Sequence, residues 1–111
     1  DEVFLAALSM GVDGAVGCTL NYMCRQYYEL YQAFRRGDLR TALALQSTVN
    51  RVVAVVGSFG TPGALTKAPL RLLGFDEMDE GRLPIRPLTP EEWERLRTEL
   101  AAAGFFALER V

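Results

Sequence analysis

The chain has few side chains that could do chemistry, and it contains no histidine. Within its own residues this excludes His-based zinc sites, Ser-His-Asp triads and Cys-His dyads. The two cysteines, Cys18 and Cys24, do not form a Cys-x-x-Cys pair and therefore predict no zinc site. A disulfide would require the fold to bring them close together. We interpret them instead as free, buried or half-buried thiols in a reducing compartment.

The only lysine of the chain is Lys67, and a lysine in an apolar segment could form a Schiff base with a carbonyl substrate. No tyrosine or glutamate partner stands beside it in sequence, so a structural role is favoured. Residues 57–63 are rich in glycine but lack the Gly-Lys-Ser/Thr that a phosphate-binding loop requires. The acidic run over residues 76–80 lacks the spacing of a calcium loop, so we predict no metal site.

Length and composition indicate what kind of domain must position these residues. The chain has 111 residues, of which 50% are hydrophobic and 23% charged, with a net charge of -2. These values suit one domain with a real core and give no basic field for nucleic acid. No apolar run approaches the ~20 residues of a membrane span. The chain begins at Asp1 with its apolar pattern already under way, which fits either a truncated or a processed polypeptide.

Hydrophobic periodicity predicts helices over residues 2–10, 21–36, 38–56, 62–73 and 90–103. Residues 13–19 are small and contain glycine, and we expect a short buried strand there. A helix followed closely by a buried strand is typical of an α/β unit. Residues 74–88 read as a loop.

Individual residues predict where these helices begin, bend and turn to solvent. Asp38 is expected to cap the third helix, on which Gln46 marks the more polar side. Pro69 removes one backbone hydrogen bond and predicts a kink in the fourth helix. Thr89 and Glu92 have the spacing of a capping box at the start of the last helix.

Two segments resemble a known enzyme family. Asp1-Glu2 and the stretch Gly-Ala-Val-Gly-Cys-Thr-Leu-Asn-Tyr over residues 14–22 look like the N-acetylneuraminate lyase branch of the pyruvate-dependent class I aldolases. That branch typically shows Asp-Glu followed by Gly-Ala-(Ile/Val)-Gly-Ser-Thr-Tyr-Asn. The resemblance continues through the segment that bears Lys67 and through residues 83–88, and it covers essentially the whole chain. The order of the C-terminal helices is shared with the dihydrodipicolinate synthase relatives.

The resemblance implies an α/β fold, namely part of a TIM (β/α)₈ barrel, which needs ~250 residues. Residues 1–37 would then hold the last β/α elements of the barrel: helix 7, strand 8 and helix 8. Residues 38–111 would form a C-terminal helical appendix, and barrel strands 1–7 would be absent from this chain. The part of the fold in this chain would be mostly helical.

The resemblance also implies an activity: reversible cleavage of a 2-keto-3-deoxy sugar acid, such as N-acetylneuraminate, to pyruvate and an aldehyde. The family uses a Schiff-base lysine on strand 6 and a tyrosine on strand 5, and neither lies in this chain. Lys67 is in the wrong element, so we expect the isolated chain to be an inactive portion of a lyase. Its implied substrate-binding residues are Asp1, Glu2 and Cys18, since carboxylates accept several O–H bonds from a polyhydroxylated substrate.

Several alternatives remain open. Taken without the family, Asp1 and Glu2 simply complement the N-terminal end of a helix. Cys18 replaces the family serine and Leu20 the family tyrosine, which admits 2-keto-3-deoxygluconate aldolase or dihydrodipicolinate synthase as the branch. The family implies no cofactor, no nucleic-acid or membrane partner, and a cytoplasmic homotetramer. A different class, a non-catalytic helical interaction domain, predicts cooperative unfolding of these residues alone, whereas a barrel fragment should expose apolar surface and associate.

Overall fold

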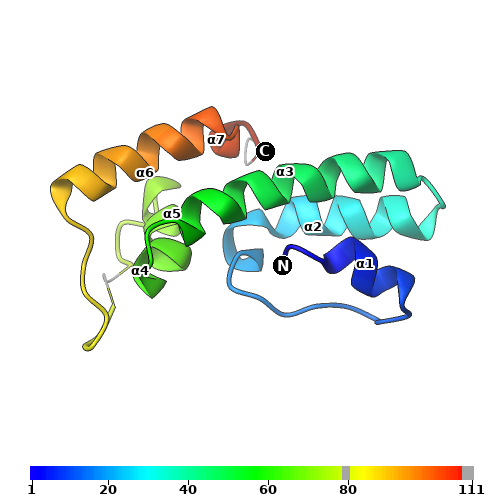
Figure 1. Ribbon diagram of the computed structural model, residues 1–111, viewed down its shortest axis with the longest axis horizontal. Coiled ribbons are helices and arrows are strands. Elements are labelled where there is room, and N and C mark those ends of the chain that lie inside the picture. Colours follow the sequence, from blue (N-terminus) through cyan, green and yellow to red (C-terminus); the bar gives the residue numbers. More distant parts are fainter. Residues whose placement is uncertain (79–80, 109–111) are drawn as a thin grey trace.

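Helices provide the regular structure of this protein in the computed structural model, which describes residues 1–78 and 81–108 (Figure 1). In chain order they are α1 (Phe4–Ser9), α2 (Leu20–Arg35), α3 (Leu39–Gly57), α4 (Pro62–Leu65), α5 (Lys67–Leu72), α6 (Pro90–Ala102) and α7 (Phe105–Leu108). The helix positions predicted from hydrophobic periodicity are therefore confirmed, except that the fourth is divided in two. No helix in the described part of the chain is long and apolar enough to cross a membrane.

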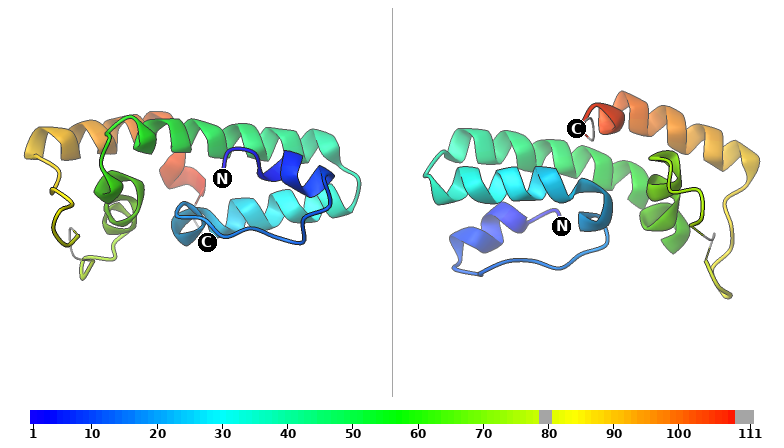
Figure 2. Two further views of the ribbon diagram at one scale, coloured as in Figure 1. Left: turned by 60° about the horizontal axis from the view of Figure 1, so that its bottom comes forward. Right: turned by 180° about the vertical axis from the view of Figure 1, so that it is seen from behind.

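The centre of the molecule is an antiparallel pair formed by α2 and α3 (Figures 1 and 2). The turn between them depends on Gly37, whose φ of 78° lies in the left-handed region that favours glycine. Asp38 then caps α3 as predicted, accepting a hydrogen bond of 3.1 Å from the Thr41 amide. Both ends of the turn are thus determined by local sequence.

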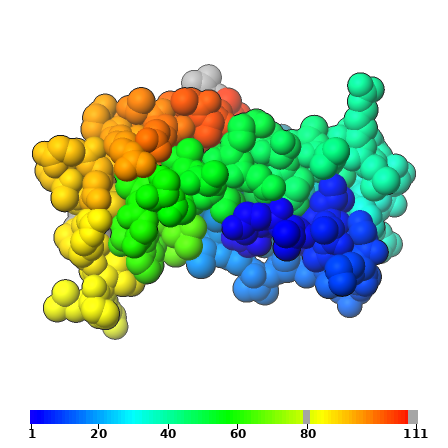
Figure 3. Space-filling model, in the orientation of Figure 1, coloured from blue at the N-terminus to red at the C-terminus, as the bar shows by residue number. Residues whose placement is uncertain are grey.

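One hydrophobic core joins this pair to the remaining helices. α6 packs against one half of α3, and the N-terminal segment that contains α1 packs against the other half (Figure 3). α7 returns to α2, where the Gln26 side-chain amide donates to the carbonyl of Leu108 at 2.8 Å. The large apolar side chains that are fully buried include Met23, Leu30, Val49, Val52, Val56, Leu96, Leu100 and Phe105.

The strand predicted at residues 13–19 does not form, and this prediction was wrong for the chain as it stands. Residues 12–17 are an irregular connection between α1 and α2 (Figure 2). The side chain of Val16 in this connection is fully exposed. A strand satisfies its backbone N–H and C=O groups through a neighbouring strand. The residues that the structure describes contain no strand with which it could pair.

Pro69 bends the fourth predicted helix as expected, and the break between α4 and α5 falls at Thr66. Proline has no N–H, so the carbonyl of Leu65 loses its usual helical donor. The Tyr22 hydroxyl from α2 supplies a substitute donor at 2.8 Å. Burial raises the pKa of Tyr22, so its hydroxyl keeps the proton that it donates.

The capping box at the start of α6 is confirmed. The Thr89 hydroxyl accepts from the Glu92 amide at 3.2 Å, and the Glu92 carboxylate accepts from the Thr89 amide at 2.9 Å. Arg86 adds two hydrogen bonds of 2.7 Å to the same carboxylate. These bonds hold the pKa of Glu92 down at about 2, the arginine being the largest cause.

Candidate functional site

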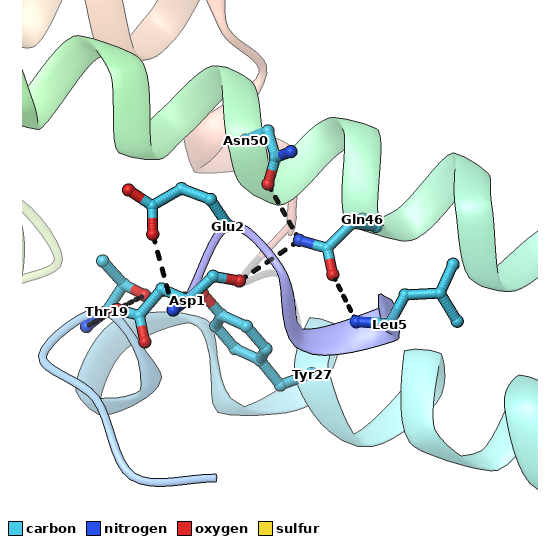
Figure 4. A network of polar contacts seen from close by, with 7 residues as sticks. All are labelled: Asp1, Glu2, Leu5, Thr19, Tyr27, Gln46 and Asn50. Carbon is cyan, nitrogen blue, oxygen red and sulfur yellow. Dashed lines mark hydrogen bonds and ion pairs between the residues drawn. The ribbon is translucent and has the colours of Figure 1, made fainter. Parts of the chain in front are cut away.

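The Asp1 carboxylate is joined to the residue that follows Cys18. Its Oδ2 atom accepts two hydrogen bonds from Thr19, one from the backbone amide at 3.2 Å and one from the hydroxyl at 2.6 Å (Figure 4). Thr19 is fully buried, and the Asp1 side chain is only 15% exposed. The structure therefore brings the Asp1-Glu2 pair next to the segment that contains Cys18, although the whole of α1 separates them in sequence.

Tyr27, on α2, extends this hydrogen-bonded chain. Its hydroxyl lies 2.6 Å from the Thr19 hydroxyl oxygen. A threonine hydroxyl carries a single hydrogen, which here points to Asp1, so Tyr27 must be the donor in the second bond. Burial raises the pKa of Tyr27, the negative charge of Glu2 raises it further, and the hydrogen bond with Thr19 acts in the opposite direction. The tyrosine is therefore a protonated donor at neutral pH.

Gly17 supplies the space for the Asp1 side chain. A Cβ atom at this position would lie 1.8 Å from Oδ1 of Asp1 and 2.7 Å from its Cγ, far inside any real contact. Only glycine fits there while Asp1 holds its bonds to Thr19. The three residues 17–19 thus have separate tasks: glycine makes room for the carboxylate, Thr19 binds it, and Cys18 is left facing outward.

Gln46, on α3, holds the backbone of the same segment. Its side-chain oxygen accepts from the Leu5 amide at 2.8 Å, and its nitrogen donates to the Asp1 carbonyl at 3.2 Å and to Asn50 at 2.8 Å (Figure 4). α1 has no side-chain cap of its own, so Gln46 satisfies one of its first unpaired amides. The sequence-based placement of Gln46 on the polar side of its helix was wrong, since only 6% of it is exposed.

The other predicted contact residues are accessible. The Glu2 side chain is 61% exposed, and its carboxylate lies 3.4 Å from the backbone nitrogen of Asp1. The pKa of Glu2 is lowered, chiefly by a backbone hydrogen bond, so the group is ionised at neutral pH. Cys18 and Cys24 are free thiols as expected, but both are exposed rather than buried.

Lys67 does not belong to this site. It lies on α5, toward the other end of the molecule from α1 (Figure 1). There it lines a small recess with Arg71 and Trp93. Among residues 1–78 and 81–108, no group of three or more Cys, Asp or Glu side chains is arranged to hold a metal ion.

Sequence reasoning overlooked Thr19, Tyr27 and Gln46 as members of the site. Thr19 had a signal, because it stands inside the 14–22 segment. Tyr27 lies within the helix predicted over residues 21–36, and nothing in that pattern pairs its hydroxyl with Thr19, eight positions earlier. Nothing in the local sequence pairs Gln46 with residues more than 40 positions earlier.

Comparison with known proteins gives consistent matches over nearly the whole chain. Residues 1–103 match the dihydrodipicolinate synthetase family. The chain is 34% identical over 107 residues to N-acetylneuraminate lyase from Mus musculus, covering 96% of this chain and 33% of that protein. It is 36% identical over 104 residues to 4-hydroxy-tetrahydrodipicolinate synthase from Mycolicibacterium paratuberculosis, covering 94% and 34%.

Solved structures agree with the sequence matches. N-acetylneuraminate lyase from Proteus mirabilis superposes with a TM-score of 0.82 at 32% identity, over 95% of this chain and 35% of that one. A dihydrodipicolinate synthase from Bacillus anthracis gives 0.80 at 27% identity, over 92% and 34%. The chain therefore spans about a third of the length of the relatives that it matches.

Proposed function

Because the chain belongs to the dihydrodipicolinate synthetase family, we propose that it is the substrate-selecting portion of a Schiff-base aldolase. The complete enzyme, meaning the polypeptide of family length that contains this chain, would reversibly cleave a 2-keto-3-deoxy sugar acid to pyruvate and an aldehyde. Support comes from the relatives, which include both N-acetylneuraminate lyases and synthases of the same family. A non-catalytic helical interaction domain has no support among the relatives named above.

In this proposal residues 1–37 are the last β/α elements of a TIM barrel, and residues 38–111 form its helical appendix. The irregular segment over residues 12–17 would become strand 8 by pairing with strands that the rest of the polypeptide supplies. The exposed apolar side chain of Val16 on this irregular segment supports the assignment. Active sites of such barrels lie at the C-terminal ends of their strands, which is where Cys18 and Thr19 would then stand.

The observation that carries the proposal is the bond between Asp1 and Thr19, which gathers the three candidate contact residues at one place. Asp1 and Glu2 would accept hydrogen bonds from substrate hydroxyls, and Cys18 would contact the same part of the substrate. No catalytic residue is assigned to this chain. The Schiff-base lysine would lie elsewhere in the complete enzyme, which the family resemblance implies is a homotetramer. The isolated chain should therefore be inactive.

Borohydride reduction in the presence of pyruvate tests this function directly. We expect the complete enzyme to acquire one covalent pyruvate adduct per subunit and to release pyruvate from a 2-keto-3-deoxy sugar acid. The isolated 111-residue chain serves as the control and should acquire no adduct. A complete enzyme that forms no adduct would refute the proposal.

The thiol of Cys18 gives a test of substrate choice. A thiol donates and accepts hydrogen bonds weakly, whereas the serine of the lyase pattern does both well. We expect Cys18→Ser to raise kcat/KM for N-acetylneuraminate relative to 2-keto-3-deoxygluconate. Cys24→Ser is the matched control, because Cys24 is also an exposed free thiol. An equal effect of both substitutions would show that Cys18 takes no part in recognition.

The synthase branch is the second candidate, and the 36% identity to a 4-hydroxy-tetrahydrodipicolinate synthase favours it specifically. In that case the complete enzyme should condense pyruvate with aspartate semialdehyde and should not cleave sugar acids. Measuring both reactions on one preparation decides between the two branches.

A further inference from the structure

A series of hydrogen bonds runs from Tyr27 through Thr19 to Asp1, and it leaves the two carboxylate oxygens of Asp1 with different surroundings. Oδ2 accepts both bonds from Thr19. Oδ1 accepts no hydrogen bond from any residue in the described part of the chain, and it lies where the missing side chain of Gly17 leaves room. A carboxylate offers about four lone pairs. The oxygen left for a ligand is therefore Oδ1, and its position depends on what holds Oδ2.

The Thr19 hydroxyl has only one arrangement in which it forms both of its side-chain hydrogen bonds. The buried Tyr27 hydroxyl gives its proton to the Thr19 oxygen, and Thr19 gives its proton to Asp1. Without Tyr27, the Thr19 hydroxyl would lose its only side-chain donor among the described residues and could rotate about its own bond. The carboxylate would then keep its amide bond of 3.2 Å but lose the fixed direction of the shorter one.

We propose that Tyr27 and Thr19 are positioning residues for substrate recognition, which together aim Oδ1 of Asp1 at a hydroxyl of the aldehyde portion of the substrate. This inference rests on the proposed function, because it assigns to Asp1 a contact with a polyhydroxylated substrate. It goes further in assigning roles to two buried residues that would not themselves touch that substrate. The hydroxyl of an α2 tyrosine thereby becomes part of the specificity of the site.

Kinetics in the direction of condensation separate this role from a general structural one. The complete enzyme is given pyruvate together with N-acetylmannosamine, the aldehyde that remains when pyruvate is removed from N-acetylneuraminate. We expect Tyr27→Phe and Thr19→Val to raise KM for the aldehyde about ten-fold or more, since a misplacement of ~1 Å can cost about a hundred-fold. KM for pyruvate and the yield of the borohydride adduct should stay at wild-type values, because neither variant changes a residue that this proposal places against pyruvate.

Two further variants make the test specific. Thr19→Ser keeps the hydroxyl and should restore KM for the aldehyde to near the wild-type value. Tyr28→Phe removes a hydroxyl from an adjacent residue that is 64% exposed, and it should change nothing. Butanal, an aldehyde without hydroxyl groups, should be used equally well by the wild type and by Tyr27→Phe.

The possible failures can be distinguished. A wild-type enzyme that forms no pyruvate adduct refutes the proposed function itself. A wild-type enzyme that forms the adduct, with an unchanged aldehyde KM in Tyr27→Phe, overturns the positioning role alone. A variant whose pyruvate KM, aldehyde KM and adduct yield all worsen together also overturns it, because that pattern belongs to a damaged fold.

Discussion

Replacing Gly17 by alanine should destabilise the protein through a single side chain. The new Cβ would lie 1.8 Å from Oδ1, 2.7 Å from Cγ and 2.9 Å from Oδ2, all of them atoms of Asp1. An ordinary contact begins at 3.4 Å, so Oδ1 must retreat by roughly 1.6 Å. Cγ and Oδ2 must retreat as well, by roughly 0.7 Å and 0.5 Å, and this lengthens the 2.6 Å bond that Oδ2 accepts from the Thr19 hydroxyl.

The expected cost follows from the bonds that are lost. A hydrogen bond to a charged group contributes about 1.5–3 kcal/mol to stability. We therefore expect Gly17→Ala to lower the free energy of unfolding by about 2 kcal/mol, equivalent to one such bond.

Urea unfolding followed by circular dichroism measures this change, and Gly14→Ala is the matched control. A Cβ at Gly14 would meet nothing within 4 Å, so that variant should be neutral or gain about 0.4–1 kcal/mol from a stiffer unfolded chain. Asp1→Ala removes all three atoms that the new Cβ would meet. In that background Gly17→Ala should cost almost nothing more. The reasoning fails if both glycine variants behave alike, or if Asp1→Ala gives no rescue.

Two other predictions concern residues that are not members of the proposed site. The pKa of Glu92 is about 2 in the folded protein against an ordinary value of 4.5, so its stabilising effect is complete above pH 4.5 and is lost as the pH falls toward 2. Glu92→Gln should flatten the fall in urea midpoint between those two pH values, and an unchanged slope would contradict the role of Arg86. Tyr22→Phe should cost about 1–3 kcal/mol, because it leaves the Leu65 carbonyl without its donor. Tyr28→Phe should show no such loss in the same unfolding assay.

Local sequence was sufficient wherever a residue acts on its own neighbours. The Thr89 and Glu92 capping box depends on a spacing of three residues, so it could be predicted without any knowledge of the fold. The same holds for the Asp38 cap. Pro69 predicted a break because a missing N–H is a property of the residue itself. Residues 1–2 and 14–22 were also sufficient to indicate the family that the comparisons confirm.

Residues 13–19 are a segment whose structure local sequence could not predict. Their composition suits a buried strand, but a strand requires partners for its backbone, and the described residues of this chain provide none. Composition reports what a segment can do, whereas pairing depends on what lies beside it.

The same distinction between local sequence and tertiary neighbours applies to the candidate site. Sequence alone identified Asp1, Glu2 and Cys18 as candidates by residue type and motif. Only the tertiary structure decided that Asp1 is held by Thr19, that Tyr27 stands behind Thr19, and that Gln46 comes from α3 to fix the backbone. The reason is physical: a hydrogen bond acts over about 3 Å, and only the packing of α1 and α3 around α2 brings such distant residues within that reach.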